Sequence, residues 1–564
     1  MFVDDIKTPD FVDQVKTDGV KSTFREGVVY RHPGMAPLLQ VSGDHYQMGL
    51  QYGVLLRPEI IRGMKAFQRM LEWQAEGMGV PCSDFSMALK TQTEQIAGRL
   101  PDRFQKEIQG MADGSGVPRA TVVAVSLIYD ASEGAACTGV LLRGKDGAII
   151  HGRNNDTSSI GGKETGNMFV IVKRRAKGYN VVTQMDYPLW GGVETGYNDR
   201  GLTFSEETLT VREPNPGGFS LTYLVRMALE ECATFEELYA LFDRYPVIGA
   251  YGCVWGQIKQ GRGLVAELTP TAWKAKEMDG PLMWNFNHLY DSELRGQQHP
   301  RTNLSHANWN RETIAETFAQ KTEYTVQHAI EFLRLQKGPG GIDFSWHGLR
   351  HPICNLGTQE MVVFDPKGDG FYFASGTYHA ARKEVYHIHD DFSRPPDLFM
   401  EAVPLDSLVE QVAAIENRLE SRAKKLDAFV ELADQHKKDA HIQFIVALNA
   451  FQQSRLDLLN RYAKKAFSLE PEIAEHRLYA GMAALMDKNS DEAISLLEAI
   501  DPKQLYPNQE LYRLSILESV WAAENPRVSS KYAALKTDIL QEHDAQLYFE
   551  SEMLPLVTAL GARR

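Results

Sequence analysis

The stretch EGAACTGVLLRGKDGAIIHGRNNDT, residues 133–157, decides how the chain is interpreted. Two short apolar runs flank Asp146-Gly147, and Asp-Gly between such runs predicts a β-hairpin. A single cysteine, Cys137, follows three small residues and opens the first run. Free cysteine is among the most buried residue types, so a structural thiol is one interpretation of Cys137. The other interpretation is a nucleophile.

The composition excludes several function classes. The chain has 564 residues, of which 43% are hydrophobic, so it can bury sizeable cores. Its net charge is −14 and its 60 Lys and Arg residues are dispersed, which argues against a nucleic-acid or anionic membrane surface. Five widely spaced cysteines suit a reducing compartment and rule out a disulfide framework. No CxxC or HExxH spacing indicates zinc, so no metal is expected.

Three regions differ in their hydrophobic period. Residues 1–136 repeat apolar residues every three or four positions, which predicts a mainly helical segment. Residues 137–400 contain hairpin signals at Asp146-Gly147, Lys177-Gly178 and Pro366-Lys367-Gly368, separated by helical stretches. This texture predicts an α+β layered fold. Residues 401–564 are helical again, and the block 478–500 resembles one tetratricopeptide unit, with a plain helical bundle as the alternative.

The chemistry of a thiol nucleophile adds a requirement. A thiol attacks a carbonyl as thiolate, so it needs a base or a cation nearby. If the peptide bond before Cys137 is cut, the freed α-amine lies next to its own sulfur, and its ordinary pKa of about 8 suits it as a base. Small residues before Cys137 would leave such a bond accessible to the thiol. Composition alone does not establish the cut.

The order of motifs resembles the cysteine N-terminal nucleophile (Ntn) hydrolases. Cys-Thr-Gly, an apolar run and an Asp-Gly turn precede Arg153 and Asp156, which stand 16 and 19 residues after Cys137, as in the choloylglycine hydrolases. Upstream, VSGDHYQMGLQYGVLLRPEI (residues 41–60) is more similar to the acyl-coenzyme A:6-aminopenicillanic acid acyltransferase-like family. The segments at 196–209, 285–289 and 353–376 resemble later motifs of that family.

The resemblance implies a fold and a processing step. The fold is a four-layer αββα sandwich, with residues 1–136 as a pro-segment that stays with the core 137–400 and a tetratricopeptide-like domain at 401–564. Self-cleavage is implied between Ala136 and Cys137. Cys137 would be the nucleophile and its own amine the base.

Roles for further residues also come from the resemblance. Asp156 would contact the amine of the nucleophile, and Arg153 would steady the thiolate. Asn287 would orient or stabilise the oxyanion, with Asn285 on the same strand face. Arg301 is a weaker candidate for a later family arginine, against a solvated arginine.

One position departs from the family pattern. Where an oxyanion asparagine is often found, this chain has Ser205-Glu206-Glu207-Thr208. A carboxylate facing an oxyanion at 4 Å would cost about 4 kcal/mol at an effective dielectric near 20. The oxyanion donor is therefore either Thr208 or a set of backbone amides. Alternatively, one glutamate binds a cationic part of the substrate, and Glu207 is the candidate for this role.

The predicted function is that of an autoproteolytic cysteine amidase or acyltransferase. Its substrate would be a small amide, or a thioester such as an acyl-CoA, and no cofactor is required. The alternative is a non-catalytic Ntn-like protein that acts as a helical binding scaffold. The expected partners are small molecules rather than nucleic acid or membrane, with homo-oligomerisation through the C-terminal helices as one option. The acidic start without an apolar core is unlike a signal peptide and predicts a cytoplasmic location.

Overall fold

The computed structural model describes residues 6–131, 137–156, 168–304, 306–319, 323–336, 352–365, 367–543 and 545–561. Two compact units are present. The first comprises residues 1–298, 313–340 and 352–405, and the second comprises residues 299–312, 341–351 and 406–564.

The first unit begins with strands and then helices. The strands are β1 Lys16–Asp18, β2 Lys21–Phe24, β3 Gly27–Tyr30 and β4 Leu38–Gly43. The helices are α1 His45–Leu55, α2 Arg57–Met78, α3 Cys82–Ala97, α4 Asp102–Ser115, α5 Arg119–Ser126 and α6 Ile128–Ala131. Residues 1–136 were expected to be mainly helical, and these four strands were not predicted. They are three to six residues long, too short to outweigh the helical period of the residues that follow; β1 is exposed along its length, whereas β3 and β4 contribute Val29, Leu39 and Val41 to the core.

From Cys137 onward, strands dominate. They are β5 Thr138–Arg143, β6 Ile149–Asp156, β7 Val170–Ala176, β8 Val182–Asp186, β9 Thr195–Asn198, β10 Leu202–Leu209, β11 Ala250–Gln257, β12 Arg262–Leu268, β13 Trp273–Glu277, β14 Leu282–Asn285, β15 Thr358–Phe364, β16 Gly370–Ser375, β17 Val385–His389 and β18 Asp397–Met400. The helices between them are α8 Leu221–Glu231, α9 Phe235–Arg244, α10 Pro300–Asn303, α11 His306–Phe318 and α12 Val326–Leu333.

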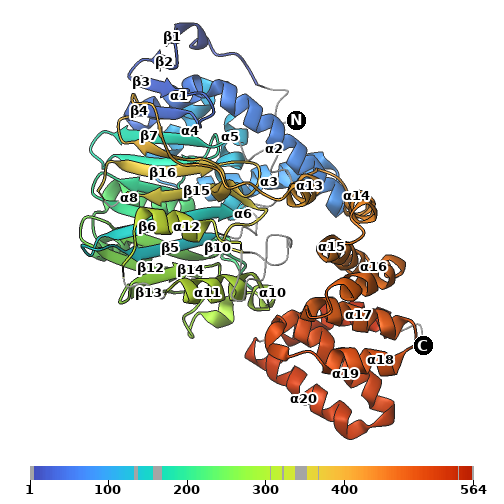
Figure 1. The fold of residues 1–564 in the computed structure, drawn as a ribbon. Helices are drawn as coiled ribbons and strands as arrows, with labels where there is room; N and C mark the ends of the chain where they lie inside the picture. The colour runs from blue at the N-terminus through green and yellow to red at the C-terminus, as the bar shows by residue number, and fades with distance from the viewer. Residues whose placement is uncertain are drawn as a thin grey trace. The chain divides into compact units, whose positions relative to one another are not determined.

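The strands form two sheets. An eleven-stranded sheet has the order β1-β2-β3-β4-β7-β8-β9-β10-β11-β12-β13, and a seven-stranded sheet has the order β14-β5-β6-β15-β16-β17-β18. The three predicted hairpins are confirmed as β5–β6, β7–β8 and β15–β16. The parallel pair β4–β7 joins a segment before Cys137 to one after it, and Figure 1 shows the two strands side by side.

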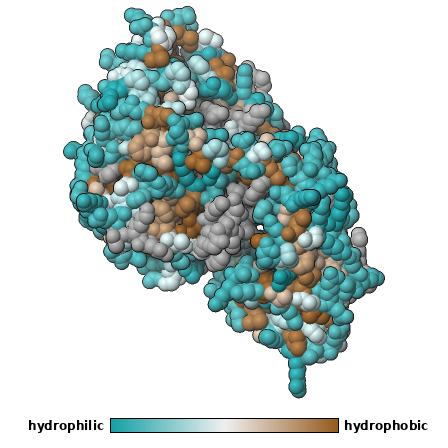
Figure 2. Space-filling view, viewed as in Figure 1, coloured by the Kyte–Doolittle hydropathy of each residue, from teal (hydrophilic) through white to brown (hydrophobic). Residues whose placement is uncertain are grey.

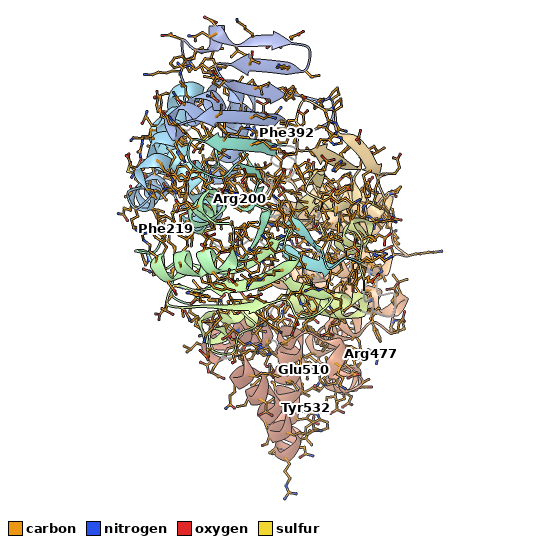
Figure 3. The ribbon with its side chains drawn as sticks, turned by 90° about the vertical axis from the view of Figure 1, so that its left-hand side faces the viewer. Arg200, Phe219, Phe392, Arg477, Glu510 and Tyr532 are labelled. Atoms are coloured by element: carbon orange, nitrogen blue, oxygen red, sulfur yellow. The ribbon has the colours of Figure 1, made fainter. Side chains whose placement is uncertain are left out.

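The sheets stack face to face between helices. On β7, Val170 and Val172 pack into a core shared with α1, α4 and α8, whereas Ile171 between them packs against the seven-stranded sheet. This alternation follows from the period of two along a strand. Phe219 belongs to the helix-side core and Phe392 to the core between the sheets, and both are labelled in Figure 3.

The outer face of the seven-stranded sheet completes the layers. Helix α12 packs on β6 and β15, and Phe318 at the end of α11 contacts Phe332 of α12. The order helix–sheet–sheet–helix confirms the predicted α+β, four-layer αββα sandwich.

The second unit is helical. After α10 and the start of α11 it contains α13 Ser407–Glu416, α14 Arg422–Gln435, α15 Ala440–Gln452, α16 Leu456–Leu469, α17 Ala474–Met486, α18 Ser490–Glu498, α19 Pro507–Glu524, α20 Pro526–Glu542, α21 Gln546–Tyr548, a π-helical turn Phe549–Met553 and α22 Leu554–Gly561. Successive helices pack on each other, and Figure 3 labels Glu510 of α19 and Tyr532 of α20. Tetratricopeptide character stays a prediction.

The face of the molecule seen in Figure 2 is largely hydrophilic, with scattered apolar patches. Within the described ranges, none of the helices combines the length and apolar character needed to cross a membrane.

Candidate functional site

Cys137 lies at the start of β5, fully buried, and two groups hold it. Arg153 Nη2 donates to Cys137 Sγ over 3.3 Å, and the backbone nitrogen of Cys137 donates to Asn287 Oδ1 over 2.7 Å. Arg153 reaches the sulfur because β6 pairs with β5 and places Arg153 directly opposite Gly139. The structure therefore brings together the thiol, the cation and the asparagine that the sequence singled out.

Local geometry fixes Asn287. Its backbone has φ of +66°, a left-handed conformation that asparagine tolerates better than most residues. Asn285 Oδ1 accepts a hydrogen bond from the Asn287 backbone nitrogen at 3.1 Å, and Asn287 Nδ2 donates to the Thr208 carbonyl at 2.8 Å. Asn287 thus links the end of β14 to β10 and to the nitrogen of Cys137. As placed, it orients that nitrogen.

Two glycines allow this close approach. A Cβ on Gly139 would lie 2.3 Å from Glu207 Oε1, and a Cβ on Gly252 would lie 2.3 Å from Asn285 Oδ1. Both positions exclude any side chain larger than hydrogen. This explains the Cys-Thr-Gly order at residues 137–139 in packing terms.

Asp156 ends β6 and is held by the opposite strand region. It accepts hydrogen bonds from Asn355 Nδ2 at 2.7 Å and from Thr358 Oγ1 at 2.5 Å. Its charge is among those that raise the pKa of the Cys137 thiol, which places it within electrostatic reach of the sulfur. These two donors fix the orientation of the Asp156 carboxyl group at the end of β6.

Of the remaining predicted residues, Glu207 and Thr208 lie near Cys137 in the structure, whereas Arg301 and Ala136 do not have described side chains. Glu207 accepts from Ser205 Oγ at 3.1 Å and lies beside Gly139, whereas Thr208 donates to Glu206 Oε1 at 2.5 Å and offers its carbonyl to Asn287. Arg301 lies on α10 in the second unit, and its side chain is outside the described residues, as is Ala136 of the predicted cleavage site.

Several residues of the site were not anticipated. Arg153 also donates to Thr195 Oγ1 and to the Glu206 carbonyl, and its Nη2 lies 3.9 Å from Glu194 Oε2 and 3.7 Å from Glu206 Oε2. Asn155 Oδ1 lies 4.0 Å from Cys137 Sγ, and its Nδ2 donates to Glu360 at 3.3 Å. Glu194 precedes β9, Glu206 lies on β10 and Glu360 on β15, so no local sequence pattern links them to Arg153, whereas Asn155 lies on β6 two residues after it.

We call Arg153, Glu194, Glu206 and Glu360 the site cluster. All four side chains are buried, and within the described part of the chain one oxygen of each carboxylate has no hydrogen-bond partner. Burial raises the pKa of Glu360 to about 7, with Arg153 opposing it, and burial together with Glu206 and Asp186 raises that of Glu194 well above its usual range. Three carboxyl groups share one cation in this cluster, and their raised pKa values favour the protonated forms.

The thiol itself is desolvated. Burial raises the pKa of Cys137, and Arg153 acts in the opposite direction. The thiol of the uncut chain is therefore protonated at neutral pH. A base would have to remove this proton for the thiol to act as a nucleophile.

A cleft of about 570 Å³ opens in the same unit along β12, β13 and β14. Met283 and Trp284 of β14 line it, together with Val265 of β12 and Tyr290. Because Asn285 ends β14, this cleft runs along the strand that leads to Asn287.

Comparisons with known proteins agree with the expected family. Residues 142–338 match the sequence model described as acyl-coenzyme A:6-aminopenicillanic acid acyl-transferase, which confirms the resemblance. The match includes Arg153, Asp156 and Asn287 and begins five residues after Cys137.

Curated relatives match over part of their length. The N-acylethanolamine-hydrolyzing acid amidase of Rattus norvegicus is 25% identical over 247 residues, covering 41% of this chain and 64% of the relative. The acid ceramidase of Mus musculus is 26% identical over 211 residues, covering 33% and 52%. The chain thus spans about half to two thirds of the length of these relatives.

Solved structures are also similar. An N-acylethanolamine-hydrolyzing acid amidase ortholog of Caenorhabditis elegans aligns at 17% identity over 41% of this chain and 93% of that chain, with a TM-score of 0.29. A conjugated bile acid hydrolase of Clostridium perfringens aligns at 11% identity over 48% and 99%, with a TM-score of 0.30.

Proposed function

We propose that this protein, whose residues 142–338 match the acyl-coenzyme A:6-aminopenicillanic acid acyl-transferase family, is a self-processing cysteine amidase. The observation that carries the proposal is the pair of hydrogen bonds that Cys137 makes with Arg153 and Asn287. Arg153 faces its sulfur and Asn287 accepts from its backbone nitrogen, so both groups that the chemistry needs are fixed in one buried place.

Processing is the first reaction proposed. Cys137 Sγ attacks the carbonyl carbon of Ala136, the C–N bond to Cys137 breaks, and the nitrogen takes a proton to become the α-amine. Water then hydrolyses the thioester and leaves Ala136 as a carboxylate. The freed amine stays within reach of Asn287 Oδ1, which already accepts a hydrogen bond from this nitrogen.

Turnover uses the same groups. The amine takes the thiol proton, and the thiolate attacks the substrate carbonyl while Arg153 offsets its charge. The C–N bond of the substrate breaks, the amine product leaves with the proton, and water releases the acyl group. An amine in place of water would give acyl transfer.

The substrate class proposed is an N-acyl amide with an apolar acyl chain. The names of the relatives describe hydrolysis of N-acylethanolamines and a ceramidase, and the cleft along β14 offers Met283 and Trp284 to an acyl chain. The location in the cytoplasm stays a prediction.

A series of N-acyl amides of one small amine, varied in acyl length, tests this function. Release of free amine by the wild type and none by Cys137→Ala is the expected result. When the reaction is quenched with acid, the protein fragment that begins with Cys137 should be heavier by one acyl group. Treatment with hydroxylamine, which cleaves thioesters, should remove this added mass. Equal turnover by Cys137→Ala would overturn the proposal.

A second variant locates the acyl group. Trp284→Ala should raise KM for long-chain amides more than for acetyl amides, because it removes apolar area from the cleft. Equal effects on both would remove the cleft from the proposal and leave the role of Cys137 intact.

A further inference from the structure

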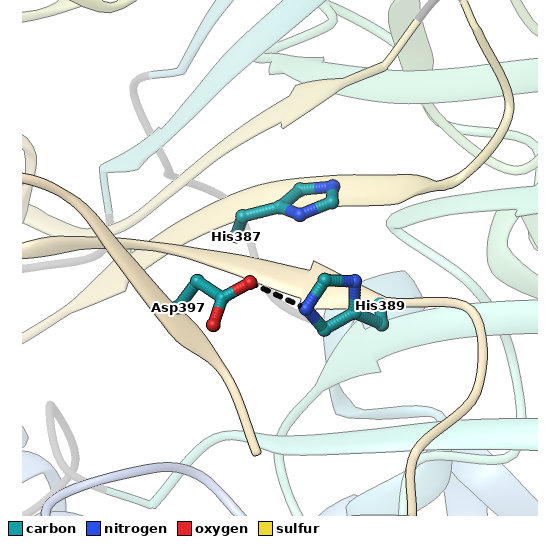
Figure 4. Close-up of side chains that lie close together, drawn as sticks. All are labelled: His387, His389 and Asp397. Atoms are coloured by element: carbon teal, nitrogen blue, oxygen red, sulfur yellow. Dashed lines mark hydrogen bonds and ion pairs between the residues drawn. The ribbon is translucent and has the colours of Figure 1, made fainter. Parts of the chain in front are cut away.

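Two histidines and an aspartate meet at the edge of the seven-stranded sheet, among residues that the amidase chemistry does not use. His387 and His389 are two residues apart on β17, so their side chains share one face. Asp397 opens β18, the edge strand, and lies opposite His387 in the register of the pair. Figure 4 shows the three side chains converging on one side of the strands.

The distances between donor atoms are short. His389 Nε2 lies 2.8 Å from Asp397 Oδ2, and one donor atom from each of the three residues falls within 4.8 Å of the others. Around tetrahedral zinc, with bonds of about 2.0–2.1 Å, donor atoms are about 3.3 Å apart. Modest side-chain rotations would bring the three donors to that spacing.

Two buried nitrogens of this cluster have no hydrogen-bond partner among the residues that the structure describes. They are His387 Nε2 and His389 Nδ1. Buried polar atoms are normally satisfied, so His387 Nε2 points to a ligand, and His389 would offer the Nε2 that contacts Asp397. The Asp397 side chain is 68% exposed, whereas those of His387 and His389 are 15% and 5% exposed, so an ion would enter from solvent past the carboxylate.

A second carboxylate supports the same location. Asp365 Oδ2 lies 3.9 Å from His387 Nε2, close enough to join the ligands or to orient the imidazole. Two carboxylates beside two imidazoles would offset the charge of a divalent ion.

We propose that His387, His389 and Asp397 form a binding site for a divalent transition metal ion, with Zn²⁺ the best match. Imidazole and carboxylate donors suit zinc, whereas Mg²⁺ and Ca²⁺ prefer all-oxygen sites. The ion would tie edge strand β18 to β17, a structural role that does not depend on the proposed amidase. His-x-His followed by Asp eight residues later is outside the spacings that indicate zinc from sequence, which is why no metal was expected.

Zinc titration of the full-length, tag-free protein tests the site. After removal of metals with a chelator, isothermal titration with ZnCl₂ should show one equivalent bound at this site, and excess Mg²⁺ should not compete. His387→Gln and His389→Gln should each weaken this binding at least about 100-fold. Asp397→Asn should weaken it about 10-fold or more, although an asparagine can still hydrogen-bond to His389.

The chain offers a matched control. His441, Glu470 and His476 form another close group, in the second unit. His441→Gln should leave the tightest equivalent of zinc unchanged. Co²⁺ bound to the wild type should give the visible spectrum of a four- or five-coordinate site, and His387→Gln should abolish it.

Two results would overturn the proposal. One is zinc binding of His387→Gln/His389→Gln, folded by circular dichroism, at wild-type affinity and stoichiometry. The other is a wild-type protein whose tightest zinc binding is weaker than about 1 mM. Either would mean that β18 is held by its pairing with β17 and by the His389–Asp397 contact, without a metal ion.

Discussion

Two buried groups of charges in the first unit behave in opposite ways. The first, which we call the interface network, joins Glu107 of α4 to Arg174 of β7 at 2.8 Å and to Arg226 of α8 at 3.1 Å, and Arg226 also bonds Glu230. The second is the site cluster, where Arg153 faces Glu194, Glu206 and Glu360. Both groups are buried, yet only the interface network balances its charges.

The pKa values follow this balance. Burial raises the pKa of Glu230, but Arg226 and His45 outweigh it and bring it down to about 2. Burial raises the pKa of Glu360 to about 7, because Arg153 is shared among several carboxylates. Charge pairing in the interface network serves cohesion, and the excess of carboxylates in the site cluster is typical of functional sites.

The interface network crosses the predicted cleavage point. Glu107 comes before Cys137, whereas Arg174 and Arg226 come after it, and the parallel pair β4–β7 crosses the same point with six residue pairs. A cut before Cys137 would therefore leave two chains held by a sheet and by buried ion pairs. This supports the prediction that residues 1–136 stay with the core.

Removal of Arg153, the cation that the site cluster shares, should have the largest effect on activity and stability. Arg153→Met takes away the partner of the Cys137 sulfur and of three carboxylates, and should lower kcat/KM by about 10²–10³-fold. Stability should fall by about 3–5 kcal/mol at pH 8 and by less at pH 5, where the carboxylates take up protons. Denaturant unfolding at both pH values measures this, and full activity of Arg153→Met would contradict the role assigned to Arg153.

Unbalancing the interface network should be the next largest effect. Glu107→Gln leaves Arg174 and Arg226 without their shared carboxylate and should cost about 3–5 kcal/mol. The half-exposed pair Glu94–Arg119, also before Cys137, provides the control, because Glu94→Gln should cost about 1 kcal/mol or less. Equal costs for the two variants, by urea unfolding, would show that the network does not hold the two segments together.

The pH dependence of stability sharpens the contrast. Folded Glu360 has a pKa of about 7 and an unfolded glutamate one of about 4.3, so between these values the folded protein holds an extra proton. Stability from this group is full below about pH 4.3 and is lost as pH rises through 7.

The free energy of unfolding of the wild type should therefore fall by about 3 kcal/mol between pH 5 and pH 8 because of Glu360, and Glu360→Gln should abolish this part of the fall. Thermal unfolding of the variant and of the wild type across this range measures the difference. If stability depends on pH in Glu360→Gln as it does in the wild type, the raised pKa of Glu360 does not contribute to the pH dependence of stability.

The smallest expected effect separates two neighbouring glutamates. Glu206 faces Arg153, whereas Glu207 lies beside Gly139 on the other face of β10. If Glu207 binds a cationic part of the substrate, Glu207→Gln should weaken kcat/KM for cationic amides several-fold more than for neutral ones. Glu206→Gln should affect both alike, and equal effects of Glu207→Gln on both substrate types would exclude this role.

Sequence reasoning succeeded where the signal is local. Each predicted hairpin has its turn residues between two apolar runs, and Cys137, Arg153 and Asn287 lie in short motifs that the fold brings together. It missed β1–β4 because β1 is exposed along its length and β2, β3 and β4 are only four to six residues long, too short to outweigh the helical period of the residues that follow.

The remainder of the site has no local signal. Glu360 approaches Arg153 through the pairing of β15 with β6, and Glu194 approaches it from the segment just before β9 of the other sheet. The direction in which Asn287 uses its amide, toward the Cys137 nitrogen, also depends on its left-handed backbone and on Asn285. Such contacts are set by tertiary structure and leave no spacing in the sequence.

The mass of the purified protein under denaturing conditions, beside Cys137→Ala, tests the central claim most directly. The 63.4 kDa chain, cut on the amino side of Cys137, should give fragments of about 15 and 48 kDa that elute together under native conditions. The variant should remain one chain. A single full-length chain for the wild type, inactive on every amide tested, would contradict a self-processing amidase and favour a binding scaffold.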